Sequence, residues 1–318
     1  MSSYEKCPIC DSEGEEVYPL DSHYIRKQLA SYFQEALPEN ISITDYTLMR
    51  CAKCTLEYAT PMKSGSNEFY NWITGHESYY PKTRWEWQIV DNIIKQIPTN
   101  IYLLEIGCGA GDFLGIVKSK ATIRAIGVDL TKKSIELCNS KKITAYCETI
   151  DEYRENEQHK VKHFDYIVSF HTLEHVTDPM GFVASMVKLL KGDGTIFIST
   201  PYSPMSFESV WFDPLNHPPH HLTRWNKKAY CELAEQLKMR IEFIVPDYPN
   251  LFSRALSSLN LQINGNTENS FHKVLFQSLA RPLKFGKELL RQAFFKKDGS
   301  KTAADVMLIA LKMTGSGA

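Results

Sequence analysis

The stretch that most constrains the fold is LLEIGCGAGDF, which begins at Leu103 and is followed by a second apolar run, IGVDL, that ends at Leu130. Three glycines at alternate positions follow the first run, and the second run leads into Asp129. Glycines let the turn after a strand tighten and let backbone N–H groups approach a ligand closely. An acidic residue about 20 positions further on can accept hydrogen bonds from both hydroxyls of a ribose. This layout predicts an adenosine-binding βαβ unit.

Glu105 separates two interpretations of the loop. A nicotinamide site has the pattern G-x-G-x-x-G after an apolar approach, so that a helix N-terminus can receive a pyrophosphate. Here the spacing is E-x-G-x-G-x-G, from Glu105 to Gly111. A carboxylate at the head of the loop would repel a pyrophosphate but would attract a cationic ligand, such as a sulfonium that also carries an amino group.

From residue 101 onward, apolar strand candidates alternate with helical segments. Such alternation favours a parallel sheet that is wound on both faces. The expected strands are Tyr102–Ile106, Ala125–Asp129, Ile143–Cys147, Tyr166–Phe170, Thr195–Thr200, Ile241–Val245 and Val306–Lys312. We expect the last of them to run antiparallel at the far edge of the sheet. The predicted fold class is α/β, with a doubly wound, mostly parallel, seven-stranded sheet.

The glycine segment resembles motif I of the class I S-adenosylmethionine-dependent methyltransferases, a family that also has the extra final strand. The resemblance implies S-adenosylmethionine as the cofactor. It places Glu105 at the positive end of this cofactor. It places the backbone of the loop glycines against the methionine part, and these glycines are Gly107, Gly109 and Gly111.

Two further segments complete the cofactor site that the resemblance implies. Asp129 would bind the ribose hydroxyls, with Leu130 against the adenine. Glu148 and Thr149, just past the third strand, occupy the positions where the family contacts the adenine edge.

The fourth strand runs into FDYIVSFHTLEHVTDP, which resembles the motif that follows this strand in the family. The resemblance places Phe170 and His171 beside the methionine part of the cofactor, and Glu174 and His175 toward the methyl acceptor. A neutral imidazole with a pKa near 6.5 can take a proton from a hydroxyl as the methyl group moves. His175 is therefore a candidate general base.

A proline-rich loop after the fifth strand, PYSPMSFESVWFDPLNHPPHHLTRW, carries His217, His220 and His221. It lies at the carboxyl end of the sheet, where ligands bind in open α/β folds. Three histidines could also suggest a metal, but His220 and His221 are adjacent and lack helical spacing. We predict that at least one of them acts on the substrate as a base, and that Tyr79 or Tyr80, from an aromatic lid, positions the acceptor.

Two C-x-x-C pairs mark the N-terminal module, and they are formed by Cys7, Cys10, Cys51 and Cys54. Each pair can direct two thiolates at one ion from a tight turn, and four thiolates fill a tetrahedral, structural Zn²⁺ site. Neither pair begins a helix in a βαβ unit, which thioredoxin-like redox chemistry requires. Asp11 and Thr55 stand where many zinc knuckles carry glycine. The pattern predicts a zinc ribbon with a helical insertion, SHYIRKQLASYFQEAL.

The chain divides into four expected parts. They are a zinc-binding module over 1–60, an aromatic lid and helix over 61–98, a methyltransferase domain over 99–250 and 302–318, and a helical insertion over 251–301. Pro282 would split the second half of the insertion, FHKVLFQSLARPLKFGKELLRQAFFKK, into two short helices that mix Leu and Phe with Lys and Arg. Two interpretations stay open, namely a subdomain that covers the cleft or forms a dimer, and a basic amphipathic surface, over 271–297, that rests on anionic lipid.

The composition narrows the choice of compartment and partners. A net charge of −1 gives no global attraction to nucleic acid. No apolar run reaches the roughly 20 residues needed to span a bilayer, and MSSYEKCPIC has no apolar signal core. We expect a cytoplasmic protein, with residues 271–297 as the segment that could contact the inner face of the membrane. Its cysteines are then thiols or metal ligands rather than disulfides.

The four-cysteine module, the aromatic lid and the LEHV loop together resemble zinc-containing bacterial methyltransferases of sugar and glycan pathways. The resemblance implies methyl transfer to a small hydroxylated acceptor, such as a sugar or glycan precursor. The antibiotic-sugar C-methyltransferases carry a further C-terminal domain that has no counterpart here, which favours oxygen over carbon as the nucleophile.

Two alternatives belong to other classes of protein. An RNA methyltransferase could use the zinc module to bind its target, but base amines are methylated with an Asn/Asp-Pro-Pro-Tyr motif where this chain has HTLE. A protein that binds the cofactor without catalysis is the other alternative. The intact glycines and Asp129 argue against it, because a degenerate site would be free to lose them.

Overall fold

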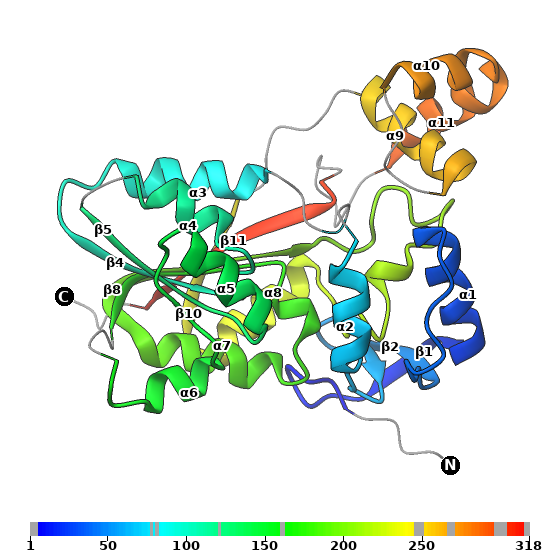
Figure 1. Ribbon diagram of the computed structural model, residues 1–318. Helices are drawn as coiled ribbons and strands as arrows, with labels where there is room; N and C mark the ends of the chain where they lie inside the picture. The colour runs from blue at the N-terminus through cyan, green and yellow to red at the C-terminus, as the bar shows by residue number, and fades with distance from the viewer. Residues whose placement is uncertain are drawn as a thin grey trace.

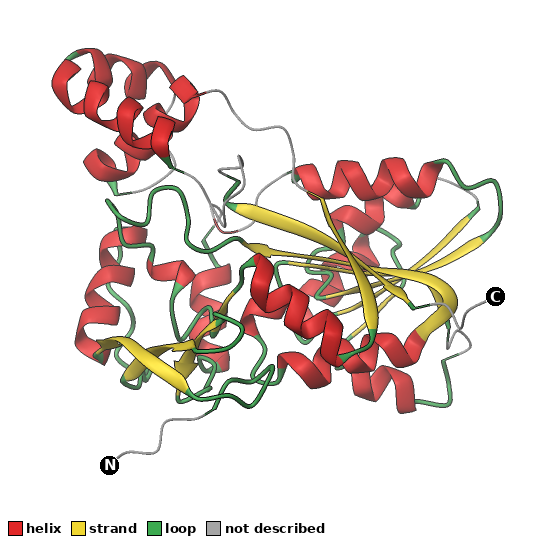
Figure 2. Ribbon diagram, turned by 180° about the vertical axis from the view of Figure 1, so that it is seen from behind, coloured by secondary structure: helices red, strands yellow, loops and turns green. Residues whose placement is uncertain are grey.

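The computed structural model describes residues 6–76, 79, 83–119, 122–159, 163–244, 251–265, 271–295 and 304–314. The expectations for Tyr80, for the strand end at Val245 and for the basic pair Lys296 and Lys297 lie outside these residues. Two sheets organise the described chain, and Figures 1 and 2 show them from opposite sides. The larger sheet has seven strands and the smaller has four.

The seven-stranded sheet is the α/β sheet that the alternating pattern predicts. Its strands, in the order β10-β11-β8-β7-β4-β5-β6, are β4 (Ile101–Ile106), β5 (Ile123–Val128), β6 (Ala145–Tyr146), β7 (Phe164–Phe170), β8 (Leu190–Pro201), β10 (Met239–Ile244) and β11 (Val306–Met313). Strands β4 to β8 pair in parallel. Strand β11 is antiparallel to both of its neighbours. The predicted fold class is confirmed.

The position expected for β11 is wrong. It lies between β8 and β10, and β10 takes the edge. The sequences of the two strands explain why β11 is interior and β10 is at the edge. In β11, VMLIAL is a continuous apolar run that is buried from Met307 to Leu311. In β10, MRIEFI alternates and exposes Arg240 and Glu242. A strand with neighbours on both sides and helices on both faces needs the continuous pattern, and an edge strand does not.

Helices cover both faces of this sheet and bury one apolar cluster on each. The first cluster joins the sheet to α3 (Trp85–Lys95), α4 (Asp112–Val117) and α5 (Lys132–Ser140). The second joins it to α6 (Ile150–Glu155), α7 (Pro179–Leu189) and α8 (Lys227–Gln236). In α3, Trp87, Val90 and Ile94 are buried at helical spacing, which confirms the predicted packing of this helix.

The four-stranded sheet belongs to the N-terminal module but takes one strand from the methyltransferase unit. Its order is β1 (Gly14–Leu20), β2 (Tyr46–Cys51), β3 (Glu57–Thr60) and β9 (Thr223–Arg224). Helix α1 (Ser22–Phe33) connects β1 to β2, as the sequence predicts, and α2 (Asn67–Thr74) follows β3. Strand β9 comes from the proline-rich loop after β8 and pairs with Glu57 and Tyr58. The module and the larger sheet also share one apolar cluster.

The insertion forms a small helical subdomain that stands apart from the large sheet (Figure 1). It contains α9 (Leu251–Asn264), α10 (Phe271–Leu279) and α11 (Pro282–Phe294), and Pro282 begins α11 as predicted. Arg291 Nη1 donates to Ser209 Oγ at 3.0 Å and Gln292 Nε2 donates to Ser206 O at 3.2 Å, so the subdomain is tied to the loop after β8. Among the helices that the structure describes, none has the length and apolar character that crossing a bilayer requires.

Candidate active site

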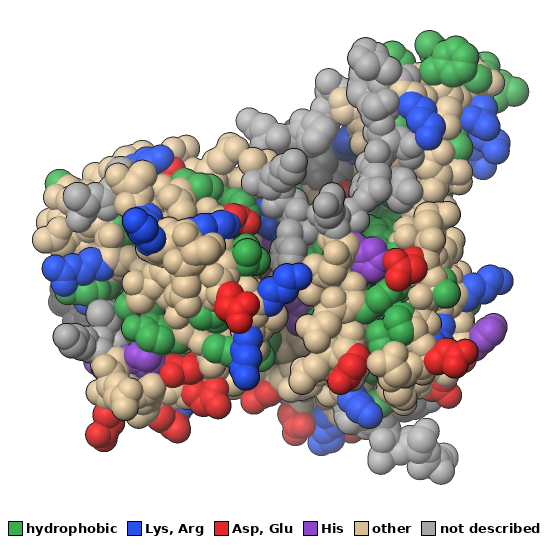
Figure 3. Space-filling model, viewed as in Figure 1, with side chains coloured by type: hydrophobic (Ala, Val, Ile, Leu, Met, Phe, Trp, Pro, Cys, Tyr) green, Lys and Arg blue, Asp and Glu red, His purple; other side chains and the backbone are tan. Residues whose placement is uncertain are grey.

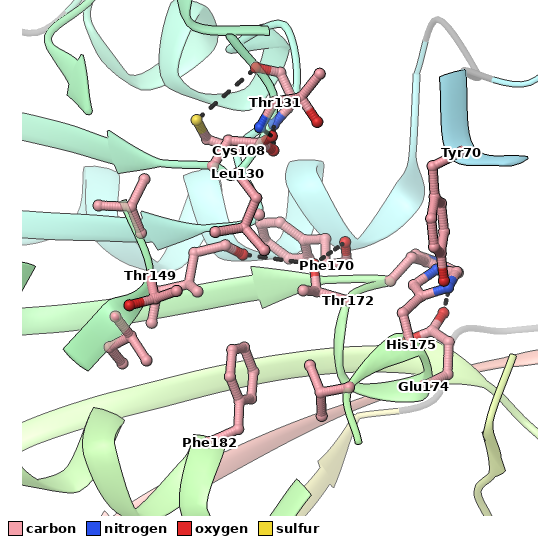
Figure 4. Close-up of a pocket in the computed structure, with 18 of the residues that line it drawn as sticks. Tyr70, Cys108, Leu130, Thr131, Thr149, Phe170, Thr172, Glu174, His175 and Phe182 are labelled. Atoms are coloured by element: carbon pink, nitrogen blue, oxygen red, sulfur yellow. Dashed lines mark hydrogen bonds and ion pairs between the residues drawn. The ribbon is translucent and has the colours of Figure 1, made fainter. Parts of the chain in front are cut away.

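A cleft of about 1520 Å³ opens at the carboxyl ends of β4, β5 and β7. This is the edge at which ligands bind in open α/β sheets. Figure 4 shows Leu130 and Thr149 on one side of the pocket, Tyr70, Glu174 and His175 on the other, and Phe170 and Thr172 between them. Single small-molecule pockets commonly measure about 300–1000 Å³. The cleft therefore has room for a cofactor and an acceptor together.

The glycine loop is shaped by contacts that a side chain would block. Gly107 has φ +73°, and a Cβ there would lie 2.2 Å from Thr172 Oγ1. Gly111 has φ +74°, and its Cβ would meet Cys138 Sγ at 2.8 Å. Positive φ favours glycine, so the backbone conformation and the lack of space both require glycine at these two positions. The Gly107 and Cys108 N–H groups donate to Val128 O at 2.9 and 3.1 Å, which folds the loop over the end of β5.

Asp129 is held rigidly by the backbone around it. Its Oδ2 accepts from Gly109 N at 2.9 Å, and its Oδ1 accepts from Thr131 N at 2.8 Å. A carboxylate has roughly four lone-pair sites, so acceptor capacity remains for hydroxyl donors. Leu130, the next residue, lies at the rim of the cleft. It is 71% exposed and presents an apolar surface to solvent.

Glu105 is the buried carboxyl of the cleft. It is 3% exposed, and its Oε2 has no hydrogen-bond partner among the described residues. Burial raises the pKa of Glu105 well above its usual range, and Cys138 and Asp129 add to the rise. Ionisation of this carboxyl is therefore disfavoured unless a cation approaches it.

Glu148 and Thr149 line the cleft, but their polar atoms already have partners. Glu148 Oε1 accepts from Asn156 Nδ2 at 2.9 Å, and Oε2 lies 2.7 Å from His159 Nε2. Thr149 is the N-cap of α6 and exchanges hydrogen bonds with Glu152. Contact with an adenine edge stays a prediction for both residues.

Phe170 and His171 form the floor between the two ends of the cleft. Phe170 is buried beside Phe113. His171 Nε2 lies 2.8 Å from Glu86 Oε1, and its Nδ1 lies 3.5 Å from Glu174 Oε1. Burial and the nearby arginine oppose a charge on His171, yet Glu174 and Glu86 raise its pKa overall. The position of Phe170 and His171 beside the methionine part of a cofactor stays a prediction.

The opposite end of the cleft gathers three histidines. His175 lies in the 3-10 turn η2 (Leu173–His175), and His220 and His221 follow the turn η3 (Pro214–Asn216). The ring centroid of His175 lies 4.5 Å from that of His220 and 4.7 Å from that of His221. Burial lowers the pKa of each of the three, so all are neutral imidazoles at neutral pH. The structure thus brings together the three histidines that the sequence proposed as bases.

His217 is the exception in that loop. Its Nε2 lies 2.7 Å from Tyr18 Oη, its Nδ1 lies 2.6 Å from Asp213 O, and its ring stacks on Phe212. These contacts join the loop to strand β1 of the N-terminal module. His217 therefore holds the loop in place and does not belong to the histidine group.

Aromatic and charged residues from the lid segment complete the acceptor end. Tyr79 Oη lies 2.9 Å from His220 Nε2, which places this predicted residue over the histidines. Tyr70 Oη donates to His220 O at 3.4 Å. Tyr70, Arg84 and Glu86 were not singled out as functional residues from the sequence. A charged residue on each side of Trp85, at the start of an apolar helix, was a signal that could have identified Arg84 and Glu86.

The four cysteines of the N-terminal module converge on one point. Their sulfurs lie within 4.8 Å of one another, with Cys7 and Cys54 at 3.5 Å and Cys10 and Cys51 at 3.4 Å. A tetrahedral ion with bonds of about 2.3 Å holds sulfurs roughly 3.8 Å apart, so the group fits zinc. The residues that replace glycine after each pair, Asp11 and Thr55, have φ values of 53° and 61°. Both turns therefore keep the knuckle conformation without glycine.

Comparisons with known proteins agree with this geometry. The family model described as a methyltransferase domain matches residues 79–240, just over half of the chain. The chain is 34% identical over 106 residues to the ubiquinone biosynthesis O-methyltransferase of Actinobacillus pleuropneumoniae serotype 5b, a match that covers 31% of this chain and 44% of that protein. The corresponding Pelagibacter ubique protein is 32% identical over 126 residues, covering 35% and 50%. The chain thus spans half or less of the length of these relatives.

Among solved structures, the chain is similar to a SAM-dependent methyltransferase from Archaeoglobus fulgidus, at 17% identity and a TM-score of 0.44, over 77% of this chain and 97% of that one. The family assignment depends on the sequence model, which spans the glycine loop, both ends of the cleft and strand β9. The protein belongs to the methyltransferase domain family, whose cofactor is S-adenosylmethionine.

Proposed function

We propose that this protein transfers a methyl group from S-adenosylmethionine to a hydroxyl of a small acceptor, a sugar or glycan precursor. The observation that carries the proposal is one cleft with two chemically different ends. One end has the glycine loop, Glu105 and Asp129, and the other has the histidine group, Tyr70 and Tyr79. The relatives named as O-methyltransferases support an oxygen acceptor.

The cofactor end suits a cationic adenosine compound. When bound, S-adenosylmethionine supplies an electrophilic methyl group. Asp129 keeps free acceptor sites for ribose hydroxyls, and Leu130 offers an apolar surface to the adenine. Glu105 has an unpartnered oxygen in a buried position, so a nearby positive charge would lower its pKa and be stabilised in return.

The acceptor end suits a hydroxyl that must lose a proton. Alignment of the nucleophile with the methyl group supplies much of the rate of such a transfer. Neutral imidazoles are good proton acceptors near neutral pH, and His175, His220 and His221 are all neutral. The phenols of Tyr70 and Tyr79 give the site further polar groups that could orient a polyhydroxylated acceptor.

The RNA alternative finds less support. A net charge of −1 leaves no overall attraction to a polyanion. Asp112, Asp129, Glu148 and Glu174 also place carboxyl groups in the described cleft, where a phosphate backbone would have to approach.

We propose further that the four-cysteine site holds a structural Zn²⁺. The cysteines are free thiols, and Cys7, Cys51 and Cys54 are buried. A hydrogen bond from Cys54 lowers the pKa of Cys7 to about 5, which favours a thiolate there. The ion would fix the turn that precedes β1 and the turn that joins β2 to β3, and through β3 it would support β9 and the histidine loop.

For the helical subdomain we propose contact with an anionic membrane surface. Large apolar side chains on α10 and α11 are 63–89% exposed, and they are Phe276, Leu279, Leu283, Leu290 and Phe294. Exposed cations lie among them, namely Lys273, Arg281, Lys284 and Lys287. Figure 3 shows green and blue side chains together at the outer end of this subdomain. An apolar surface mixed with cations matches an anionic lipid interface.

Glu105→Gln is expected to raise stability and lower cofactor affinity. Because the pKa of Glu105 is raised in the folded state, ionisation disfavours folding, and this cost grows as the pH rises above about 4.3. Glutamine has no such cost, so the variant should melt at a higher temperature near neutral pH, with no difference near pH 4. Calorimetry should show S-adenosylmethionine binding about tenfold weaker, or about 1.4 kcal/mol. Exposed Glu157→Gln is the control, and a lower melting temperature with unchanged affinity would contradict the assignment.

Incubation with methyl-labelled S-adenosylmethionine tests the acceptor. We expect label in nucleotide sugars, glycans or other small hydroxylated compounds, and none with Asp129→Ala. His175→Ala and His220→Ala should bind the cofactor normally but slow the transfer by about 10²–10⁴. Label in total RNA alone would overturn the proposed function, and full turnover in both histidine variants would remove the base assignment.

Metal analysis of the purified protein should give about one equivalent of zinc, since one tetrahedral site uses all four thiolates. Cys51→Ser should lose most of this zinc and unfold at a lower temperature. Cys147→Ser, which changes an exposed cysteine outside the group, is the matched control and should keep both. Less than half an equivalent in the unaltered protein would count against the zinc site.

Co-sedimentation with vesicles tests the membrane surface. Binding to anionic vesicles should exceed binding to neutral ones and fall as salt rises. Leu283→Asp with Phe294→Asp should abolish it, whereas Leu137→Asp, at an exposed apolar residue of α5, should not. Equal, negligible binding to both vesicle types, or a stable dimer that the double variant dissociates, would show that lipid is not the partner.

A further inference from the structure

The three histidines at the acceptor end direct one ring nitrogen each toward a common point. Those nitrogens, on His175, His220 and His221, lie within 4.8 Å of one another. Bonds of about 2.1 Å to a shared tetrahedral ion would hold these nitrogens roughly 3.4 Å apart, so they would move together by up to roughly 1.4 Å, a shift within the reach of side-chain rotation. Packing of the imidazoles alone does not require these nitrogens to lie so close together. The hydrogen bonds of the second ring nitrogens and the charges around the group therefore indicate whether it suits an ion.

Carbonyl groups hold the other nitrogen of each ring. His175 Nδ1 lies 2.7 Å from His220 O, and His220 Nδ1 lies 2.7 Å from Leu215 O. His221 Nδ1 lies 3.1 Å from Asn216 Oδ1. A carbonyl oxygen can only accept, so Nδ1 carries the proton and Nε2 has the lone pair. The lone pair of His220 Nε2 accepts a hydrogen bond from Tyr79 Oη at 2.9 Å, which a bound ion would replace. Histidines that bind metals almost always donate their other N–H in this way, which fixes the tautomer and aims the ligand atom.

The backbone explains how two adjacent residues can serve one point. The N–H groups of His220 and His221 both donate to His217 O, at 3.1 and 3.0 Å, so the chain turns tightly here. The two rings consequently stack with their planes 21° apart and their centroids 4.6 Å apart. Residues with helical spacing reach the same result on one helix face. The absence of helical spacing, which argued against a metal in the sequence, is therefore no obstacle.

A buried carboxylate without hydrogen bonds lies beside the group. Glu174 is 1% exposed, and neither of its oxygens has a hydrogen-bond partner among the described residues. Its Oε1 is 3.9 Å from His221 Nε2, too far for a hydrogen bond. Burying a carboxylate without such bonds is costly unless a positive charge compensates it. A proton on His171, whose Nδ1 lies 3.5 Å from Glu174 Oε1, would compensate it in part, and a cation at the histidines would add to this.

We infer that His175, His220 and His221 form a binding site for a divalent transition-metal ion, with Glu174 as the neighbouring negative charge. Three protein ligands leave an open position, which is the arrangement of catalytic rather than structural metal sites. Imidazole ligands select ions such as Co²⁺, Ni²⁺ or Zn²⁺ over Mg²⁺. The inference deepens the proposed function and rests on it in one respect: the acceptor hydroxyl would occupy the open position, where the ion would lower its pKa so that its proton leaves to water in the cleft. The oxygen would then take the methyl group from the sulfonium, which leaves as a neutral thioether.

Titration with Co²⁺ of tag-free protein that holds one equivalent of zinc tests this site, because the four thiolates, which zinc prefers, are then already occupied. Calorimetry should find one further equivalent, and the visible spectrum should lack thiolate charge-transfer bands. His220→Asn and His221→Asn should each weaken binding by about tenfold or more. His23→Asn is the control, since it changes an exposed histidine of α1 that lies outside the group. Glu174→Gln keeps all three ligands and should weaken binding less, even if a histidine variant fails to fold.

Binding of S-adenosylhomocysteine to the same samples separates this inference from the proposed function. Cofactor-product binding with no second Co²⁺ equivalent, or Co²⁺ binding that survives both His220→Asn and His221→Asn, would overturn the metal site alone. Co²⁺ binding without any binding of S-adenosylhomocysteine would overturn the methyltransferase function and leave the metal site standing.

Discussion

The acceptor end of the cleft depends on a buried ion pair that is remote from the glycine loop. Strand β9 has two residues, and it pairs with β3 through Arg224 and Thr223. Arg224 is 2% exposed and reaches Glu57 at 3.0 Å, and it also pairs with Glu208. A buried charge that loses its partner costs several kcal/mol, so this arginine fixes a strand that two residues of pairing alone would hold weakly. The histidine loop enters β9 directly, and Leu222 N donates to Glu174 O at 2.7 Å.

The N-terminal module therefore belongs to the catalytic machinery in a structural sense. Its cysteines close the turns around β1 and β2, β2 supports β3, and β3 supports β9. Tyr18 of β1 holds His217, which shapes the turn that carries His220 and His221. Loss of order in the module would thus be transmitted to the acceptor end, while the glycine loop, which depends on β5 and Thr172, would keep its shape.

The sequence predicted best those features that local pattern determines. The strands of the large sheet, the glycine turn and the cysteine pairs all follow from residue spacing within a few positions. It failed where partners lie far apart along the chain. The interior place of β11 depends on which neighbours it finds, and β9 is too short to leave any periodic signal. His217 looks like His220 in the sequence, and a tyrosine 199 positions away separates their roles. Arg84 and Glu86 matter because the fold brings His171 and Glu174 to them.

The charges of the cleft follow an order that suits transfer of a methyl group from a cation. Carboxyl groups at Glu105 and Asp129 lie at the cofactor end, where burial disfavours ionisation of Glu105 until a positive charge arrives. His171 Nε2 lies 2.8 Å from Glu86 Oε1 in the middle. The histidine group beyond it is neutral. A cationic cofactor is therefore attracted to one end, whereas the other end keeps lone pairs for a proton or an ion.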